Sequence, residues 1–420
     1  MHGSISESSG ETMKILIANL GSTSFKYRLF ELPAQTGVLE GEQELARGGV
    51  ERIGGQESRV YASLEQPAAE ARHIETLQPI PDHGVALEAA IEQLTAEGGP
   101  LSSLTDVAAI GFKAVHGGRV RGVVKVDDTV LSAMGEMADV APAHNPPYVT
   151  AMKQLAERFP DVPLVAAFET DFHATIPDRN SRYAVPKEWL EKHLVRRWGF
   201  HGASHRFVAE RLLANMSQHP LRSVQCHLGG SSSICWTRDG QSVGTSMGMS
   251  PQSGVPQNNR SGDVDPYALL HVSKTTGRSL EELLVELSTR AGLAGMSGTS
   301  GDMRDLEAAA ANGNEAARVA LDVYVGSIRH WLGGGIVELG GLDAIAFTGG
   351  IGENSPDTRA AVVAGLNDLN IEIDSTANHS DTTGERRIES PRSRVAIWVI
   401  PTNEELIVAR QTRNFLALAS

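Results

Sequence analysis

The stretch that decides the fold is KILIANLGSTSFKYRLFEL, which runs from Lys14 to Leu32. An apolar run leads into a small-residue turn and then into a run of alternating polarity, which predicts the two strands of a hairpin. The same order returns in SVQCHLGGSSSICW (223–236), and Asp239–Gly240 then signals a turn into a third strand. Because LGSTS (20–24) aligns with LGGSS (228–232), the sequence predicts an internal duplication that gives two related lobes with a cleft between them.

Helical and strand-like patterns alternate along the rest of the chain, which indicates α/β lobes rather than an all-α or all-β protein. Three consecutive glycines, 333–335, interrupt one helical pattern and suggest a kink or close packing. The C-terminal residues 403–419 form an amphipathic pattern that we expect to cross back onto the first lobe. Helices are expected at 83–98, 147–159, 279–292 and 315–332, and strands at 107–115, 162–168 and 342–348.

These patterns divide the chain into three parts. Residues 1–12 are polar and acidic and are expected to be a flexible leader, without the basic start and apolar core of a signal peptide. Residues 13–170 together with 402–420 are expected to form the N-terminal lobe, and residues 171–401 the C-terminal lobe.

The composition narrows the classes of partner. The 420 residues are 41% hydrophobic and 21% charged, as in ordinary globular proteins, and the formal charge of −14 argues against a nucleic-acid partner. Two cysteines exclude a disulfide scaffold and favour a reducing compartment. No apolar run reaches the roughly 18 residues that span a bilayer. We therefore expect a cytoplasmic protein that does not bind membranes.

Three glycine- and serine-rich turns are candidates for holding phosphate, because small residues leave backbone N–H groups accessible to an anion. NLGSTS (19–24) and HLGGSSS (227–233) follow strands at repeat-related positions, although a tight hairpin turn explains each one alone. In FTGGIGENS (347–355) a strand meets glycines and then a helix start at Ser355–Pro356. That order is typical of nucleotide-binding loops, and a purely structural turn stays an open alternative.

Two histidines in RRWGFHGASH (196–205) lie four residues apart, a spacing that on one helix face would suit a metal ion. Ser204, however, is expected to cap the following helix, which would put His205 in its first turn and His201 in the loop before it. A helix N-terminus favours an anion instead of zinc. We therefore expect a functional role for His201 and a structural one for His205.

Further charged residues have the types that phosphoryl transfer needs. Lys113 ends a strand beside a glycine turn, Arg260 lies in a long polar loop, and Glu404 and Glu405 lie at a strand-to-helix junction. Each alone is commonly a solvated surface residue or a helix cap. Together they supply cations for a phosphoryl group and carboxylates for magnesium.

Ten motifs follow one another along the chain: IANLGSTSFKY, VHGG, HNPP, RRWGFHGASH, HLGGSSS, TSMG, RSGDVDP, SGDMRDL, FTGGIGENS and IPTNEEL. They occur in the order found in acetate kinase and its propionate and butyrate kinase relatives, so that the chain resembles this family from Met13 to its C-terminus. The resemblance implies the two-lobed fold shared by sugar kinases, heat-shock ATPases and actin, with the nucleotide in the cleft and held mainly by the C-terminal lobe, and usually a homodimer.

The resemblance also implies an activity, the reversible phosphorylation of acetate or propionate by ATP to give an acyl phosphate and ADP. The implied cofactor is Mg²⁺, with Mn²⁺ possible in its place. Alternatives stay open: a kinase of this fold with another acid acceptor or a pyrophosphate donor, or a weakly active nucleotide-binding regulator.

The family's functional positions carry over to residues of this sequence. The catalytic set is Asn19, Lys113, Glu169, His201 and Arg260, and the metal ligands are Asn19 and Glu404. Lys113 would hold the carboxylate of the acid, and an apolar slot for its alkyl end is formed by Val115, Ala143, Phe200 and Pro251. The nucleotide-binding set is Lys26, His227, Leu228, Gly229, Gly230, Ser231, Asp302, Met303, Arg304, Gly350, Ile351, Gly352 and Asn354.

The sequence departs from the family at several of these positions. Lys113 replaces an arginine and loses its bidentate fork, and Glu169 replaces an aspartate. Gly230 stands where the family has an asparagine, Gly244 where it has an aspartate, and Ala143 where it has a leucine. The smaller Ala143 predicts a wider alkyl slot that accepts propionate at least as well as acetate.

Overall fold

The computed structural model describes residues 11–38, 40–66 and 69–419, so most of the expected leader lies outside the described residues. The first strand, β1 (Thr12–Leu20), begins one residue before the expected start. The chain divides into two compact units. Unit 1 contains the described residues up to Asp171 together with the chain from Glu404 onward, and unit 2 is Phe172–Asn403.

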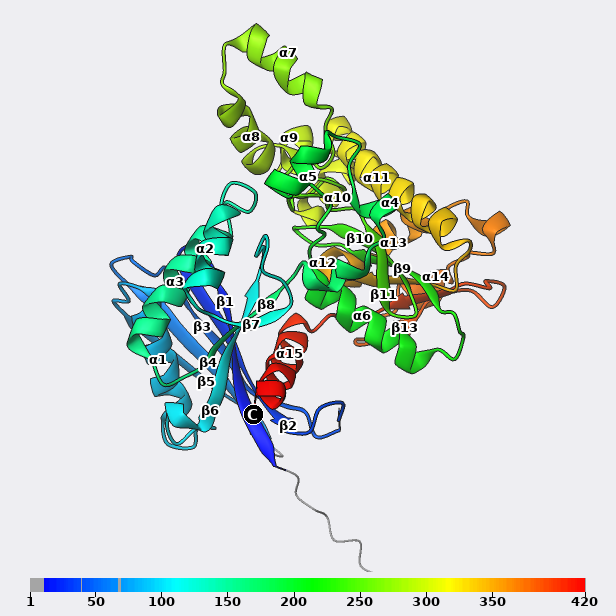
Figure 1. Cartoon of the computed structure of the whole chain (residues 1–420). Helices are drawn as coiled ribbons and strands as arrows, with labels where there is room; N and C mark the ends of the chain where they lie inside the picture. Colours follow the sequence, from blue (N-terminus) through cyan, green and yellow to red (C-terminus); the bar gives the residue numbers. More distant parts are fainter. Residues whose placement is uncertain (1–10, 39, 67–68, 420) are drawn as a thin grey trace, which may run out of the picture. The chain divides into compact units, whose positions relative to one another are not determined.

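Unit 1 is built on an eight-stranded sheet (Figure 1). β1 pairs antiparallel with β2 (Ser24–Pro33), as the hairpin pattern predicted, and parallel with β6 (Val107–Ala114). The strand order is β5-β4-β3-β2-β1-β6-β8-β7. The remaining strands are β3 (Gln43–Glu51), β4 (Ser58–Gln66), β5 (Ala69–Gln78), β7 (Val123–Lys125) and β8 (Leu164–Phe168).

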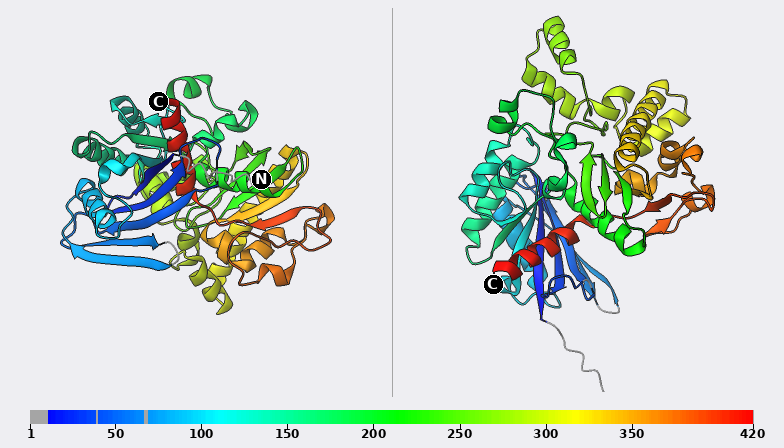
Figure 2. Two further views of the ribbon diagram at one scale, coloured as in Figure 1. Left: turned by 90° about the horizontal axis from the view of Figure 1, so that it is seen from below. Right: turned by 45° about the vertical axis from the view of Figure 1, so that its right-hand side comes forward.

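Helices cover both faces of this sheet, because alternate residues of β1 are buried on opposite sides. Leu16 and Ala18 pack into the core formed with α1 (His83–Thr95) and α3 (Asn145–Arg158), beside which lies α2 (Asp128–Glu136). The C-terminal helix α15 (Glu404–Ala419) lies against the opposite face of the sheet (Figure 2). A Cβ atom on Gly111 of β6 would lie 2.5 Å from Thr412 Oγ1 of α15, so this glycine permits the close approach. The C-terminal helix therefore completes unit 1.

Unit 2 contains a six-stranded sheet of order β11-β10-β9-β12-β14-β13. Its central strand, β9, pairs antiparallel with β10 and parallel with β12, as β1 pairs with β2 and β6 in unit 1. Strands β11-β10-β9-β12-β14 thus repeat the order and directions of β3-β2-β1-β6-β8, and the predicted duplication is confirmed. The strands are β9 (Arg222–His227), β10 (Ser233–Arg238), β11 (Gln241–Thr245), β12 (Ala344–Thr348), β13 (Arg386–Arg387) and β14 (Ala396–Val399).

The two faces of this second sheet differ in chemistry. The long helix α11 (Glu315–Leu339) covers an apolar face to which Val224 and Trp236 belong, and it runs through the glycine triplet without interruption. A Cβ atom on Gly335 would lie 3.0 Å from Val224 Cγ2, so close packing explains that glycine. Helix α6 (Gly202–Asn215) covers the other face, where strands β9 and β10 present polar side chains.

Shorter helices surround the sheet of unit 2. Two of them, α7 (Pro266–Thr276) and α8 (Leu280–Thr289), extend away from it in Figure 1. The others are α4 (Asp178–Ser181), α5 (Lys187–His193), α9 (Gly292–Ser297), α10 (Met303–Ala311), α12 (Gly349–Asn354), α13 (Pro356–Val363) and α14 (Ser375–Asn378). Single 3₁₀ turns occur at Leu104–Asp106, Asp171–Thr175 and Asn367–Leu369.

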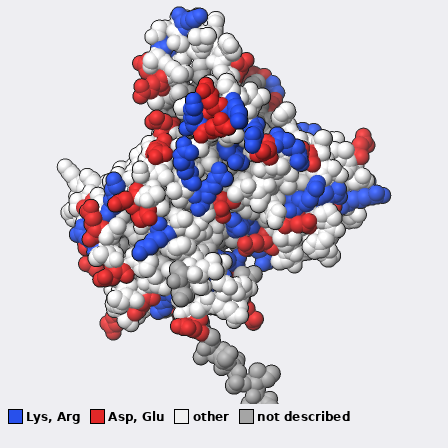
Figure 3. Space-filling model, viewed as in Figure 1, with Lys and Arg blue, Asp and Glu red and all other residues white. Residues whose placement is uncertain are grey.

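Surface charge is mixed in sign. On the face shown in Figure 3, lysine and arginine side chains are interspersed with aspartate and glutamate. Within the described residues, no helix is both long enough and apolar enough to cross a bilayer.

Candidate active site

Three of the predicted site residues of unit 1 lie at one edge of its sheet. β1, β6 and β8 run parallel, so their carboxyl ends meet at the same edge. Asn19 lies near the end of β1 and Lys113 near the end of β6, and Glu169 directly follows β8. The first residue of α15, Glu404, joins them through an ion pair with Lys113. Residues separated by almost the whole sequence thus form one polar cluster.

The ion pair between Lys113 and Glu404 is largely shielded from water. The side chains are 21% and 14% exposed, respectively. Burial lowers the pKa of Lys113, but the negative charges of Glu404 and Glu169 outweigh that effect and raise the pKa above the usual lysine value. The ammonium group therefore stays charged at neutral pH.

Tyr148 of α3 orients Asn19, a role that the sequence did not reveal. The Tyr148 hydroxyl donates to Asn19 Oδ1 at 3.0 Å and accepts the Leu20 N–H at 3.2 Å. Burial raises the pKa of Tyr148 to about 12, so the hydroxyl keeps its proton. In the sequence this tyrosine is one apolar-face residue of a helix, and no local signal marks its contact with β1.

The oxygen-rich cluster of unit 1 has the donor chemistry that magnesium prefers. Asn19 contributes an amide oxygen, and Glu404 and Glu169 contribute carboxylates. Within the described residues, no group of three histidine, cysteine, aspartate or glutamate side chains is arranged to hold a metal by itself. Magnesium in kinases is commonly held by one or two carboxylates plus substrate phosphates, so these residues fit such a site.

The other predicted site residues of unit 1 differ in their exposure to solvent. Val115 follows β6 and is half-buried, whereas Ala143, in the loop before α3, is exposed. Lys26 is exposed on β2, directly opposite Asn19 in the ladder. Beside Val115, burial lowers the pKa of His116 to about 4, and its Nδ1 accepts the Gly118 N–H in the glycine turn.

In unit 2, Arg260 is anchored beside the turn that follows β9. Its guanidinium donates to Gln257 Oε1 at 3.1 Å, and the Ser231 hydroxyl donates to the same oxygen at 2.7 Å. Burial lowers the pKa of Arg260 from its usual value, and the side chain stays cationic. Arg260 and Ser231, which the resemblance assigned to separate roles, are thus brought together by Gln257, which the sequence did not single out.

His201 occupies the position before α6 with left-handed backbone angles (φ 56°, ψ 33°). Its imidazole stacks on that of His227 with the ring centroids 4.2 Å apart. His227 directly precedes the second glycine turn, at the end of β9. Left-handed geometry is unusual for a residue other than glycine and is found mostly where the surroundings fix the conformation.

The expected cap of α6 is wrong. The helix begins at Gly202, three residues upstream of the expected first turn, and Ser204 lies inside it with its hydroxyl bonded to His227 Nδ1 at 2.8 Å. His205 is fully buried and bonds Gln225 and Ser233. His201 lies before the helix, as expected, and both His201 and His205 bond the Ser233 hydroxyl.

A cavity of about 400 Å³ in unit 2 gathers eight residues of the predicted nucleotide-binding set. It lies between the glycine turn after β9, the start of α10 and the short helix α12. Asp302 caps α10 by accepting the Arg304 N–H, and the Arg304 guanidinium lowers the pKa of Asp302 to about 2. The predicted residues of this cavity are Gly229, Gly230, Asp302, Met303, Arg304, Gly350, Ile351 and Asn354.

The glycines of FTGGIGENS form a helix rather than the expected loop. They build α12, and the N–H groups of Ile351 and Gly352 donate to the Leu228 carbonyl. The expected helix start at Ser355–Pro356 is confirmed, since the Ser355 hydroxyl caps α13. Leu228 and Gly352 thus join the segment after β9 to α12, and they do not line the cavity.

Asn258 lines the same cavity and was not predicted. Its backbone N–H donates to the Gly230 carbonyl, and its Nδ2 lies 3.5 Å from where a Cβ atom on Gly230 would be. The Asn258 amide therefore occupies the neighbourhood of the side chain that Gly230 lacks.

The structure also accounts for Gly244. A Cβ atom there would lie 2.4 Å from the indole of Trp236, its cross-strand neighbour. The indole thus fills the space that a side chain at position 244 would need.

Two residues assigned to the alkyl slot belong to unit 2. Phe200 is buried, and its carbonyl is bonded by His173 Nε2 at 2.9 Å. Pro251 is also buried, and its carbonyl accepts from Gln257 Nε2 at 2.9 Å. Both positions are therefore fixed by buried hydrogen bonds to their carbonyl groups.

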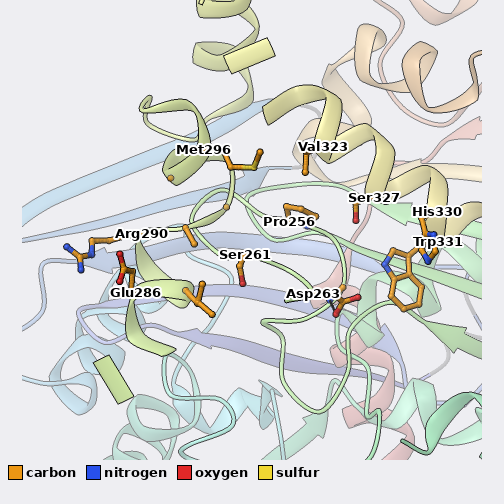
Figure 4. A pocket seen from close by; sticks show the side chains of 15 residues that line it. Pro256, Ser261, Asp263, Glu286, Arg290, Met296, Val323, Ser327, His330 and Trp331 are labelled. Carbon is orange, nitrogen blue, oxygen red and sulfur yellow. Dashed lines mark hydrogen bonds between the residues drawn. The ribbon is translucent and has the colours of Figure 1, made fainter. Parts of the chain in front are cut away.

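A second, larger cavity of about 750 Å³ contains none of the predicted site residues (Figure 4). It lies beside α8, α9 and α11, and its wall includes Met296, Val323 and Trp331.

Comparison with known proteins gives a consistent result. The model of the Acetokinase family matches residues 14–410. The chain is 40% identical over 403 residues to the acetate kinase of Shouchella clausii, which covers 95% of this chain and 98% of that protein.

Solved structures agree with the sequence relatives. The acetate kinase of Porphyromonas gingivalis superposes with a TM-score of 0.84 at 33% identity, covering 96% of this chain and all of that one. A propionate kinase from Francisella tularensis gives a TM-score of 0.85 at 32% identity, covering 96% and 99%. These neighbours have the two-lobe fold of sugar kinases, heat-shock ATPases and actin, so the predicted fold class is confirmed.

Proposed function

Since the chain belongs to the acetate kinase family, we propose that it transfers the γ-phosphoryl group of ATP reversibly to the carboxylate of a short-chain fatty acid, giving an acyl phosphate and ADP. The observation that carries this proposal is the cavity in which the glycine turn at 229–230 meets Asp302, Arg304 and α12. Glycines beside a helix N-terminus suit the phosphates of a nucleotide.

The acid needs no general base, because a carboxylate is already a competent nucleophile. Catalysis then depends on positioning and on stabilising charge. We assign Lys113 to the carboxylate of the acid, and His201 and Arg260 to the equatorial oxygens of the transferring phosphoryl group. Because Lys113 is paired with Glu404, the Lys113 ammonium group must loosen its contact with Glu404 when it binds the carboxylate of the acid.

Asn19, Glu404 and Glu169 are proposed to hold Mg²⁺, or Mn²⁺ in its place. When bound, the metal would neutralise phosphate oxygens. The hydroxyl of Tyr148 keeps the Asn19 amide in one orientation, so that its oxygen and nitrogen are not exchanged.

We assign the alkyl end of the acid to Val115, Ala143, Phe200 and Pro251. Alanine in place of the family's leucine would leave room at one wall of the slot, which favours propionate or a slightly longer acid.

A homodimer is proposed from the surface of α7 and α8. All residues of α7 are described and none is buried, yet this helix carries Tyr267 and Leu270, which are 77% and 48% exposed. Neighbouring α8 adds the exposed Leu280, Leu284 and Val285. Exposed apolar side chains on two adjacent helices suit a second copy of the chain. Light scattering should give a dimer mass that Tyr267→Glu combined with Leu284→Glu reduces to a monomer, and a monomeric unmodified chain would contradict the proposal.

The activity itself is tested by trapping the product. Acyl phosphates react with hydroxylamine to give hydroxamates, so incubation with ATP, Mg²⁺ and propionate should give a hydroxamate that disappears without the metal. Formation with pyrophosphate instead of ATP would favour the other donor. Nucleotide binding without any hydroxamate would favour a regulator.

A further inference from the structure

A chain of hydrogen bonds leads from the interior of unit 2 to the imidazole of His201. His201 Nδ1 lies 2.9 Å from the Ser233 hydroxyl, and the same hydroxyl lies 2.8 Å from His205 Nε2. The other nitrogen of His205 lies 3.1 Å from the side-chain amide of Gln225. Ser233, His205 and Gln225 are fully buried, so no water competes for these bonds.

The ring of His201 is also fixed in orientation. One face stacks on His227, whose own Nδ1 is bonded to the Ser204 hydroxyl. One face of the ring thus lies against His227 and Nδ1 faces Ser233, so Nε2 is the ring nitrogen that points away from Ser233.

The direction of the hydrogen bonds decides which nitrogen of His201 carries the proton. Burial, together with the neighbouring histidines, keeps the pKa of His205 well below its usual value, so His205 is neutral and has a single N–H. The Ser233 hydroxyl also has one proton and donates to only one of its two imidazole neighbours. Either every bond points outward toward His201, or every bond points inward toward Gln225.

The amide of Gln225 favours the outward direction. If its oxygen accepts from His205, its nitrogen has no hydrogen-bond partner in the part of the chain that the structure describes. Turning the amide by 180° lets its nitrogen donate to His205 and leaves its oxygen without a partner. A buried carbonyl oxygen without a partner costs less free energy than a buried N–H group without one. Gln225 then donates to His205 Nδ1, His205 Nε2–H donates to Ser233, and Ser233 donates to His201 Nδ1.

We propose that Ser233, backed by His205, is a positioning residue that holds the imidazole of His201 as its Nε2–H tautomer. The proton on Nε2 then donates to the transferring phosphoryl group while the ring stays neutral. The tautomer follows from the hydrogen bonds, the neutral state of His205 and the orientation of the Gln225 amide, whereas its role in phosphoryl transfer rests on the proposed function.

The tautomer can be read directly by NMR of the full chain labelled with ¹⁵N-histidine, because protonated and bare ring nitrogens have well separated shifts. The His201 signals are assigned from their loss in His201→Gln. We expect the unmodified protein at pH 7.5 to show a proton on Nε2 only. A proton on Nδ1, or on both nitrogens, would overturn the proposal whether or not the protein is an active kinase.

Variants test the role of the hydroxyl. Ser233→Ala should move the His201 signals toward the average of two tautomers and lower kcat by about tenfold with the KM for ATP little changed, the size expected when one orienting hydrogen bond is lost. Ser233→Thr, which keeps the hydroxyl, should show the His201 signals and the kcat of the unmodified protein. An unchanged His201 spectrum in Ser233→Ala would refute the proposal.

A matched control separates positioning from stability. Ser223 is a buried serine of the same sheet whose hydroxyl is hydrogen-bonded to the Thr237 hydroxyl at 2.7 Å. Ser223→Ala should lower the free energy of unfolding by about as much as Ser233→Ala does while leaving the His201 signals and kcat in place. If it changes both as much as Ser233→Ala does, the effect is a general loss of packing and the proposal fails.

Discussion

Replacing Lys113 by methionine removes the cation that Glu404 and Glu169 face while keeping a side chain of similar length. Removing one partner of a buried ion pair costs about 3–5 kcal/mol, whereas an exposed pair is worth about 0.2–1 kcal/mol. The Lys113–Glu404 pair, 21% and 14% exposed, lies nearer the buried case. We therefore expect the variant to lose about 2–3 kcal/mol of unfolding free energy at pH 7.

The pH dependence follows from the raised pKa of Lys113. A lysine whose pKa is higher in the folded state stabilises fully below its unfolded value of about 10.4, and loses that contribution only as the pH rises through the folded value. The stabilisation in the unmodified protein is therefore present throughout the neutral range. In Lys113→Met the carboxylates left behind become protonated in acid, so the difference between the two proteins should narrow toward pH 4.

The two units can be followed separately during urea unfolding. All five tryptophans lie in unit 2, so their fluorescence reports that unit, whereas far-ultraviolet circular dichroism reports both. Lys113→Met should lower the midpoint of the dichroism transition of unit 1 more than that of the fluorescence transition. Lys192→Met is the matched control, because its pair with Glu188 is 67% and 60% exposed and should cost only about 0.3–0.5 kcal/mol. Equal midpoints for the unmodified protein and Lys113→Met would refute the view that this pair stabilises unit 1.

Three further predictions concern the reaction. His201→Ala should lower kcat by about 100-fold or more, the usual result of removing one transition-state donor, while the protein stays folded; an active variant would exclude this histidine from the chemistry. Ala143→Leu should shift the ratio of kcat/KM for propionate over acetate toward acetate, and an unaltered ratio would mean that another side chain fills the slot. Asn258→Ala should raise the KM for ATP by about 2- to 10-fold, as for one lost hydrogen bond, and Gly230→Asn in that background should restore it; failure of the restoration would show that the two positions act independently.

The sequence predicted the architecture well because the decisive signals are local. Both hairpins, the turn at Asp239–Gly240 and the C-terminal amphipathic helix each depend on a short run of residues and appear where expected. The wrong cap of α6 shows the limit of such signals. Ser204 is a favourable capping residue, but the tertiary contacts of His201 fix a left-handed backbone that starts the helix earlier, and the serine hydroxyl bonds His227 instead.

Sequence reasoning missed the residues that act across long distances in the chain. Tyr148 reaches Asn19 from 129 positions away, and Gln257 reaches Ser231 from another loop. Asn258 meets Gly230 in the same way. Their residue types are common and their local patterns ordinary, so only the fold reveals that they support the candidate site.

The central claim, that this chain is a kinase of short-chain carboxylic acids, is tested most directly by a coupled assay that follows ADP release from ATP and Mg²⁺ across a panel of carboxylic acids. We expect release to depend on the acid and on the metal, with kcat/KM for propionate at least equal to that for acetate. ADP release that no acid in the panel stimulates, by a protein that still binds ATP, would contradict the claim.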